Sequence, residues 1–199
     1  MRLRSLQIIL WIAATAAVAT FSAVRWWPAT DDTATAAAAF APAFTLADSE
    51  GRIRSTAEFR GKFLLVFFGF TSCPDVCPTT LAEVAQVLDD LGSDAGSVQP
   101  IFISIDPERD TPQALKDYLS SDGFPKGTIG LTGTPEQVAT AAKAYRAFYQ
   151  KVGEGEGYTM NHSLTVYLMG PDGKFRTAVA YGLGPDKATK IIEDAMARG

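Results

Sequence analysis

Residues 62–80 read KFLLVFFGFTSCPDVCPTT, and this stretch decides which fold the rest of the chain can build. Phe63–Phe70 is an uninterrupted apolar run of strand length between turn residues, a pattern typical of a central strand covered on both faces. The run ends in a loop with the only two cysteines, Cys73 and Cys77, and a proline follows each. Proline disfavours the α conformation for the residue before it, so we predict that both cysteines lie outside regular helix and that a helix begins at Pro78.

Two thiols beside a helix N-terminus favour chemistry on sulfur. The partial positive charge at that end of a helix stabilises thiolates. A disulfide between Cys73 and Cys77 would close a loop of about five residues and remove only roughly 2 kcal/mol of unfolded-state entropy, against about 4.7 kcal/mol for a hundred-residue loop. A purely structural disulfide is therefore a poor explanation of the pair, and redox or metal chemistry is favoured.

Length and charge limit the classes of function. The 199 residues, 47% of them hydrophobic, suffice for one domain with an N-terminal extension. Residues 1–28 hold three of the 18 basic residues and none of the 22 acidic ones, which leaves residues 29–199 with a balance of −7. An acidic domain argues against nucleic acid as a partner, because phosphate contacts need clustered Lys and Arg. It argues equally against binding to a membrane surface.

The N-terminal segment predicts export across a membrane. Residues 5–24 read SLQIILWIAATAAVATFSAV and carry no charge, a length that crosses a bilayer as one transmembrane helix. Arg2 and Arg4 precede the segment, and this excess of positive charge places that end in the cytoplasm. We therefore expect a single-pass protein of the cell inner membrane, with a membrane anchor at 1–26 and the C-terminal domain in the periplasm.

A cleaved signal peptide is the alternative interpretation of this segment. Ala17-Val18-Ala19 has the small-residue form of a cleavage site. The apolar run is longer than a usual signal core, and Trp26-Trp27 resembles an interfacial anchor, so we favour the uncleaved anchor. Both interpretations export Cys73 and Cys77 to an oxidising compartment.

The rest of the chain divides into a flexible linker at 27–42 and one domain at 43–199. Apolar runs, Thr-Pro pairs and glycine turns mark its elements. After the linker we expect a hairpin of 44–46 and 52–54, the central strand, a helix from Pro78 to Leu91, a strand at Val98–Ile105, a helix after Thr111, a short strand, a helix after Thr134 that includes Phe148, a flexible loop at Gly153–Gly157, a hairpin of Leu164–Met169 and Phe175–Tyr181, and a helix at Pro185–Ala197.

This order predicts an α/β, thioredoxin-like fold. A βαβ half followed by an antiparallel ββα half gives a central mixed sheet flanked by helices, to which the N-terminal β-hairpin and the single N-terminal transmembrane helix are added. In such a fold the reactive loop lies at the carboxyl end of a central strand, where Cys73 is expected.

His162, the only histidine, directly precedes a predicted strand. A lone histidine is most often a surface or satisfied core residue, but in a thioredoxin-like sheet this position faces the cysteine loop and favours a shared site. Two thiolates and one imidazole suit copper. Zinc would accept the same donors, although a structural zinc site normally has four ligands. Met160 either adds a weak thioether ligand or packs in the core.

Four blocks of sequence, taken in order, resemble one known family. They are Gly61-Lys62, Thr71-Ser72-Cys73-Pro74-Asp75-Val76-Cys77-Pro78, Asp106-Pro107-Glu108-Arg109-Asp110-Thr111-Pro112, and His162-Ser163 followed by Tyr167-Leu168 and Gly170-Pro171-Asp172-Gly173. With these blocks the chain resembles the Sco/SenC family of membrane-anchored copper proteins, which take part in assembling cytochrome c oxidase. The resemblance extends from about Phe44 to Ala197.

The resemblance implies copper ligands at Cys73, Cys77 and His162, and binding of both Cu(I) and Cu(II). It further implies delivery of copper to the dinuclear copper centre of cytochrome c oxidase subunit II or a similar copper acceptor. A copper donor chaperone and a thiol reductase are further expected partners. The family usually has an acid before the histidine, whereas this chain has Asn161, which keeps hydrogen bonding but removes a charge near His162.

The segment Asp106–Asp110 is expected to form a loop beside the site. Two interpretations stand side by side. In one, its carboxylates cap a helix and pair locally with Arg109; in the other, the loop is a docking surface for a partner.

Two functions use the same residues. The first is a membrane-anchored copper metallochaperone, which is a binding protein rather than an enzyme. The second is a membrane-tethered thiol–disulfide reductase, in which Cys73 and Cys77 are a redox-active pair that keeps the acceptor's cysteines reduced. His162 distinguishes the two, because a metal site needs it and dithiol exchange does not.

Overall fold

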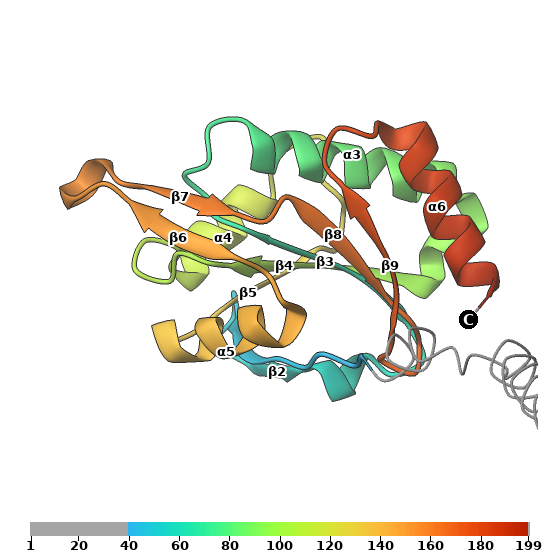
Figure 1. Ribbon diagram of the computed structural model, residues 1–199, viewed down its shortest axis with the longest axis horizontal. Coiled ribbons are helices and arrows are strands. Elements are labelled where there is room, and N and C mark those ends of the chain that lie inside the picture. Colours follow the sequence, from blue (N-terminus) through green and yellow to red (C-terminus); the bar gives the residue numbers. More distant parts are fainter. Residues whose placement is uncertain (1–39, 199) are drawn as a thin grey trace, which may run out of the picture. The chain divides into compact units, whose positions relative to one another are not determined.

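Seven strands form one mixed sheet in the order β2-β1-β5-β4-β3-β8-β9, and two more form a separate hairpin, β6-β7 (Figure 1). The computed structural model describes residues 40–198. The strands are β1 Thr45–Asp48, β2 Ile53–Ser55, β3 Phe63–Gly69, β4 Val98–Ser104, β5 Ile129–Thr132, β6 Tyr149–Val152, β7 Thr159–His162, β8 Thr165–Met169 and β9 Phe175–Ala180. The helices are α3 Val76–Asp90, α4 Pro112–Leu119, α5 Pro135–Tyr145 and α6 Pro185–Ala197, with short 3-10 turns at Thr56–Phe59, Gly92–Ser97 and Gly155–Gly157.

The strand predicted to be central is central. β3 is buried along its length and pairs in parallel with β4 and antiparallel with β8. The N-terminal hairpin of β1 and β2 and the final hairpin of β8 and β9 also form as expected. These features confirm the thioredoxin-like α/β arrangement. The predicted anchor at 5–24 lies outside the described residues, and among residues 40–198 no helix is long and apolar enough to cross a membrane.

Helices cover both faces of the sheet. The β3-α3-β4 and β4-α4-β5 crossovers step in the same direction, so their usual right-handedness places α3 and α4 on one face. Phe67 on that face lies against Phe102, which lies against Tyr118 of α4. Phe68 points to the other face and packs edge-on against Tyr145 of α5, with ring centroids 5.4 Å apart. In Figure 1, α3 and α6 lie together on one side of the sheet and α5 on the other.

Both helices that begin at Thr-Pro pairs are capped as predicted. The Thr111 hydroxyl accepts a hydrogen bond from the Ala114 amide, and Thr134 and Gln137 form a reciprocal capping box. The prediction that the second of these helices includes Phe148 is wrong. The helix ends at Tyr145 because Arg146 adopts a left-handed conformation with φ of 55°, which leaves Phe148 59% exposed.

The first described residues pack at the amino end of β3. The Phe175 amide donates a 2.8 Å hydrogen bond to the Phe40 carbonyl, and the two rings meet edge-on. Phe175 pairs with Met169, which in turn pairs with Leu64 near the start of β3. The cysteine loop follows the carboxyl end of the same strand, so the two features lie at opposite ends of the sheet.

Candidate metal centre

The two cysteines lie on the loop and helix that follow β3. Cys73 is in the loop, as predicted, but Cys77 lies in the first turn of α3, which begins at Val76 rather than at Pro78. The prediction of a later start was wrong because the first-turn amides of a helix have no intrahelical acceptor, so proline is tolerated there. The Cys77 amide donates instead to Cys73 Sγ at 3.4 Å. The sulfur of Cys73 thus accepts a hydrogen bond from a first-turn amide of α3, the helix that carries Cys77.

Gly69 makes room for the Cys77 sulfur, a role that the sequence analysis missed. A Cβ at Gly69 would lie 3.0 Å from Cys77 Sγ and 2.8 Å from Cε2 of Phe102, which is fully buried. A glycine inside an otherwise apolar strand is the signal that could have identified this position, because it marks a close approach of other groups to the backbone.

His162 is the last residue of β7, in the hairpin that the sequence analysis did not predict. β6 and β7 pair antiparallel, with Tyr149 opposite His162. The expected flexible loop at Gly153–Gly157 is the turn of this hairpin and includes a 3-10 turn. In Figure 1 the hairpin extends beyond the end of the seven-stranded sheet and returns the chain toward the cysteine loop.

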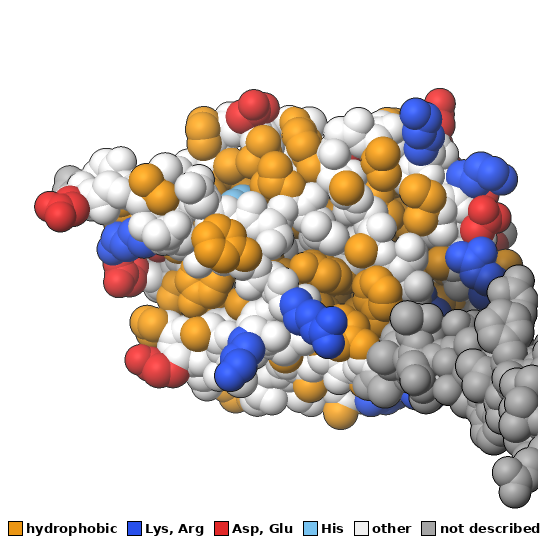
Figure 2. Space-filling view, viewed as in Figure 1, with side chains coloured by type: hydrophobic (Ala, Val, Ile, Leu, Met, Phe, Trp, Pro, Cys, Tyr) orange, Lys and Arg blue, Asp and Glu red, His pale blue; other side chains and the backbone are white. Residues whose placement is uncertain are grey.

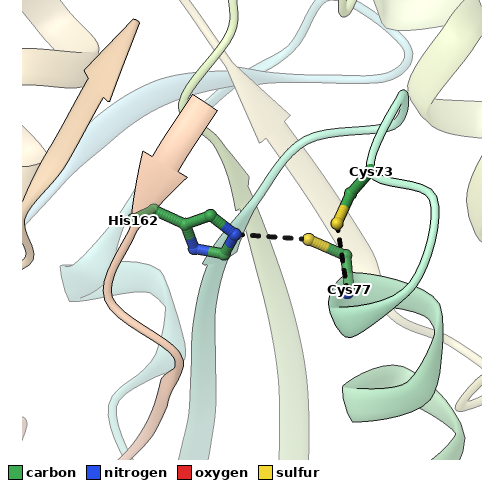
Figure 3. Close-up of side chains that lie close together, drawn as sticks. All are labelled: Cys73, Cys77 and His162. Carbon is green, nitrogen blue, oxygen red and sulfur yellow. Dashed lines mark hydrogen bonds between the residues drawn. The ribbon is translucent and has the colours of Figure 1, made fainter. Parts of the chain in front are cut away.

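The structure brings the three predicted ligands together. One donor atom from each of Cys73, Cys77 and His162 lies within 4.8 Å of the other two. Figure 3 shows the Cys77 sulfur pointing at the imidazole, with 3.5 Å between Sγ and Nε2. Cys73 and Cys77 are free thiols. Cys73 and Cys77 precede His162 by 89 and 85 positions along the chain, yet the three residues form a single set of two sulfurs and one nitrogen.

The Ser163 carbonyl fixes which imidazole nitrogen faces the cysteines. It lies 3.0 Å from His162 Nδ1, and because a carbonyl can only accept, Nδ1–H is the donor. In the neutral ring Nε2 then carries a lone pair toward Cys77. Burial lowers the pKa of the imidazole, which keeps it neutral at pH 7. Phe67 and Phe70 pack edge-on against the ring and restrict its rotation.

Asn161 does not orient the histidine. Its side chain is exposed, and within residues 40–198 it makes no hydrogen bond to His162. The polar partner of the ring is the Ser163 carbonyl, so the orienting role expected near the histidine falls on the backbone.

The two sulfurs lie in an apolar environment. Cys73 is 8% exposed and Cys77 is fully buried. Burial raises the pKa of the Cys77 thiol above its usual range, with smaller contributions that include the neighbouring Cys73. The helix N-terminus was expected to favour thiolate at both positions; at Cys77 the effect of burial is larger. A metal ion that binds there must displace the proton.

The site opens to solvent through a cavity of about 290 Å³. Cys73, His162 and Met160 line it together with Phe70, Pro74 and Leu164, so Met160 lies beside the predicted ligands. In Figure 2 a small part of the histidine side chain, in pale blue, is visible at the surface between clusters of hydrophobic side chains. The cavity leaves a path by which an ion or a small side chain from a partner can reach Cys73 and His162, whereas Cys77 does not line it.

The Asp106–Asp110 loop lies against the site but does not cap a helix. Thr111 caps α4, whereas Asp110 is fully buried and accepts hydrogen bonds from Thr71 and Ser104. The expected local ion pair is present, with Arg109 Nε 2.5 Å from Asp106 Oδ2. The capping interpretation of the carboxylates is therefore wrong, and the ion-pair part of it is confirmed.

Comparison with known proteins shows which family the chain is similar to. Residues 32–197 match the SCO1/SenC family model. The SCO2 homolog of Bos taurus, a mitochondrial protein, is 39% identical over 158 residues, 77% of this chain and 59% of the relative. This chain thus spans about three fifths of the length of that relative.

Solved structures agree in fold. Copper-bound ScoI of Arabidopsis thaliana has a TM-score of 0.74 at 34% identity, over 81% of this chain and 100% of that one. Copper-bound ScoI of Bradyrhizobium japonicum has a TM-score of 0.70 at 41% identity, over 79% and 100%. BsSco, described as having a disulfide switch and as a member of the Sco family of cytochrome c oxidase assembly proteins, has a TM-score of 0.59 at 26% identity, over 78% and 92%. The chain belongs to the SCO1/SenC family.

Proposed function

We propose that this chain is a copper metallochaperone that binds one copper ion through Cys73, Cys77 and His162 and passes it to an acceptor in cytochrome c oxidase assembly. The observation that carries the proposal is the convergence of two sulfurs and one imidazole nitrogen within 4.8 Å. This donor set suits copper, and copper is bound in the related ScoI structures.

The geometry also suits an ion that has to leave. Three protein ligands beside an open cavity leave at least one side of the ion accessible to an incoming thiolate. Transfer then proceeds by ligand exchange, in which each thiolate of the acceptor forms a bond to copper as Cys73 or Cys77 leaves it. Copper is cargo in this scheme, and its oxidation state does not change.

We further propose the dinuclear copper centre of oxidase subunit II as acceptor, and the inner membrane as location, with an uncleaved anchor at 5–24 and the domain in the periplasm. The uncharged N-terminal segment supports the anchor, and the assembly role described for BsSco supports the acceptor. Retention of the full chain in the membrane pellet after alkaline extraction, with the domain digested by protease added to spheroplasts, is the expected result.

The experiment that tests copper binding is an anaerobic titration of the reduced full chain in detergent, with a competing Cu(I) chelator. We expect one tightly bound copper per chain in the parent, and strong weakening in Cys73→Ser and His162→Ala. Met160→Leu is the matched control, because it removes a sulfur that lines the same cavity. A parent that binds no copper, or a His162→Ala variant with full affinity, contradicts the metallochaperone.

A thiol–disulfide reductase is the second candidate, favoured by two neighbouring free thiols, of which Cys73 lines the cavity and Cys77 is buried behind the surface. In that reaction the dithiol of Cys73 and Cys77 becomes a disulfide while a disulfide of the acceptor becomes two thiols, with two electrons and two protons transferred. An acceptor peptide with a disulfide would be reduced at the same rate by the parent and by His162→Ala. A rate that depends on His162 counts against it.

A further inference from the structure

The hairpin that carries His162 is not part of the main sheet. β6 and β7 pair only with each other among the described strands, while the cysteine loop continues directly from central β3. A two-stranded hairpin is at best marginally stable by itself in water. Something outside the β6-β7 ladder must therefore hold His162 within 3.5 Å of Cys77.

Tyr158, the residue immediately before β7, attaches the hairpin to the Asp106–Asp110 loop. Its hydroxyl donates to Asp106 Oδ1, and its carbonyl accepts a 3.0 Å hydrogen bond from Arg109 Nη1. The Arg109 guanidinium also lies 3.7 Å from the centre of the Tyr158 ring. Tyr158 is 8% exposed and Asp106 is 3% exposed, so these contacts are shielded from water and correspondingly strong.

A second contact supports the first from the other strand of the hairpin. Lys151 of β6 donates a 2.7 Å hydrogen bond to Glu108 and places its ammonium 3.9 Å from the centre of the Tyr158 ring. Both side chains of this ion pair are largely exposed, so it contributes little. Of the polar contacts between the hairpin and the Asp106–Asp110 loop, those of Tyr158 are therefore the stronger.

The same loop is attached to the cysteine side at its other end. Asp110 accepts hydrogen bonds from the Thr71 amide at 3.1 Å and the Thr71 hydroxyl at 2.6 Å. Thr71 is two residues before Cys73. A five-residue loop thus contacts both the element that carries the histidine and the element that carries the cysteines.

We infer that Tyr158 and Arg109 are positioning residues for His162, which hold the histidine hairpin against the Asp106–Asp110 loop and so set the separation of the imidazole from the two sulfurs. For its copper readout the inference rests on the proposed function. For the geometry of the metal-free protein it does not.

The test on the metal-free protein uses the single histidine, whose imidazole signals in an NMR spectrum need no assignment. Tyr158→Phe removes the hydroxyl but keeps the ring on which Arg109 stacks. We expect it to broaden or shift the His162 signals and to weaken the nuclear Overhauser contacts between the imidazole and Phe70. Tyr149→Phe is the control, since Tyr149 is on the same hairpin and its hydroxyl has no hydrogen bond within residues 40–198.

The test on the copper-loaded protein measures affinity and the Cu(II)–thiolate absorption bands. Loss of a group that orients a metal ligand typically lowers affinity about 10–100-fold, and we expect this for Tyr158→Phe and Arg109→Lys, with a shifted Cu(II) spectrum. Arg109→Lys keeps the positive charge but loses the planar stacking on Tyr158 and the paired N–H donors of the guanidinium. Charge alone is therefore not expected to preserve the copper affinity. Thermal unfolding of each variant separates this effect from a loss of fold.

The outcomes are distinguishable. Unchanged His162 signals in Tyr158→Phe, or copper affinity and spectrum equal to those of Tyr149→Phe, overturn the inference. If the parent binds no copper while Tyr158→Phe still changes the His162 signals, the proposed function fails and the positioning role stands.

Discussion

The two halves of the metal centre have different structural support. The cysteines belong to the loop and first helical turn that follow β3, a buried central strand of the sheet, and Cys77 is fully buried against Gly69. The histidine belongs to a hairpin outside that sheet, held by a few side chains (Figures 1 and 3). The difference teaches that the chain buries its two sulfurs beside the central strand and carries its imidazole on a hairpin that, among the described strands, pairs with no strand of the main sheet.

Hydrogen exchange tests most directly whether the hairpin opens more easily than the core strands. Core strands open with a free energy near that of global unfolding, whereas peripheral hairpins open locally at lower cost. We expect amides of β3 and β4 to exchange roughly a thousandfold more slowly than those of β6 and β7. Equal protection of both regions, measured by mass spectrometry on the metal-free chain, would show that the hairpin belongs to the same cooperative unit.

The next largest effect is expected on copper affinity, when one predicted ligand is removed from either half of the site. Four-ligand zinc sites gain about 10–16 kcal/mol, so one ligand is worth roughly 3 kcal/mol, or about a hundredfold in affinity. We expect a loss of about a hundredfold for His162→Ala and a larger one for Cys77→Ala, because ordering the hairpin offsets part of the gain from the imidazole. Competition with a Cu(I) chelator measures both, and a reversed order would contradict the comparison.

Gly69→Ala tests the tight packing on the cysteine side. A methyl group there meets Phe102 at 2.8 Å and Cys77 Sγ at 3.0 Å, and such overpacking typically costs about 1–3 kcal/mol of stability. We expect a lower urea midpoint together with weaker copper binding, because the sulfur is displaced. Gly96→Ala is the matched control, since a Cβ at Gly96 has open space around it. Equal midpoints for the two variants would argue against tight packing.

The pH dependence of copper binding gives the smallest effect. Burial raises the pKa of Cys77, so below that pKa the thiol is protonated and copper must displace its proton. Each unit of pH increase then raises the apparent affinity about tenfold through this group alone. His162 adds nothing between pH 7 and 8, because its lowered pKa leaves it neutral there. An affinity independent of pH in this interval would show that the Cys77 thiolate is already formed.

Prediction from sequence succeeded where the signal is local. The apolar run of β3, the Thr-Pro helix starts at Thr111 and Thr134 and the closing helix at Pro185–Ala197 each follow from neighbouring residues, and the structure confirms them. The three donor residues were also found, because two cysteines and one histidine leave few combinations. Their meeting is seen in the geometry, and their role as copper ligands stays a prediction.

The histidine hairpin escaped prediction because its stability comes from contacts distant in sequence. β6 reads YQKV and is mostly exposed, so it shows no hydrophobic period of its own. The residue that attaches the hairpin, Tyr158, bonds to Asp106, 52 positions earlier. The Asp106–Asp110 loop was expected beside the site, but no local pattern indicates that its two ends contact the two different elements that carry the histidine and the cysteines.

Phe40, the first described residue, and the three candidate ligands lie at opposite ends of the central strand. Phe40 packs at the amino end of β3, and the residues predicted to bind copper lie beyond the carboxyl end of this strand of 7 residues. At about 3.3 Å per residue the strand separates the two points by roughly 23 Å. The described part of the chain therefore begins at the end of the domain remote from the opening of the cavity, and no residue between Phe40 and β1 lines that opening.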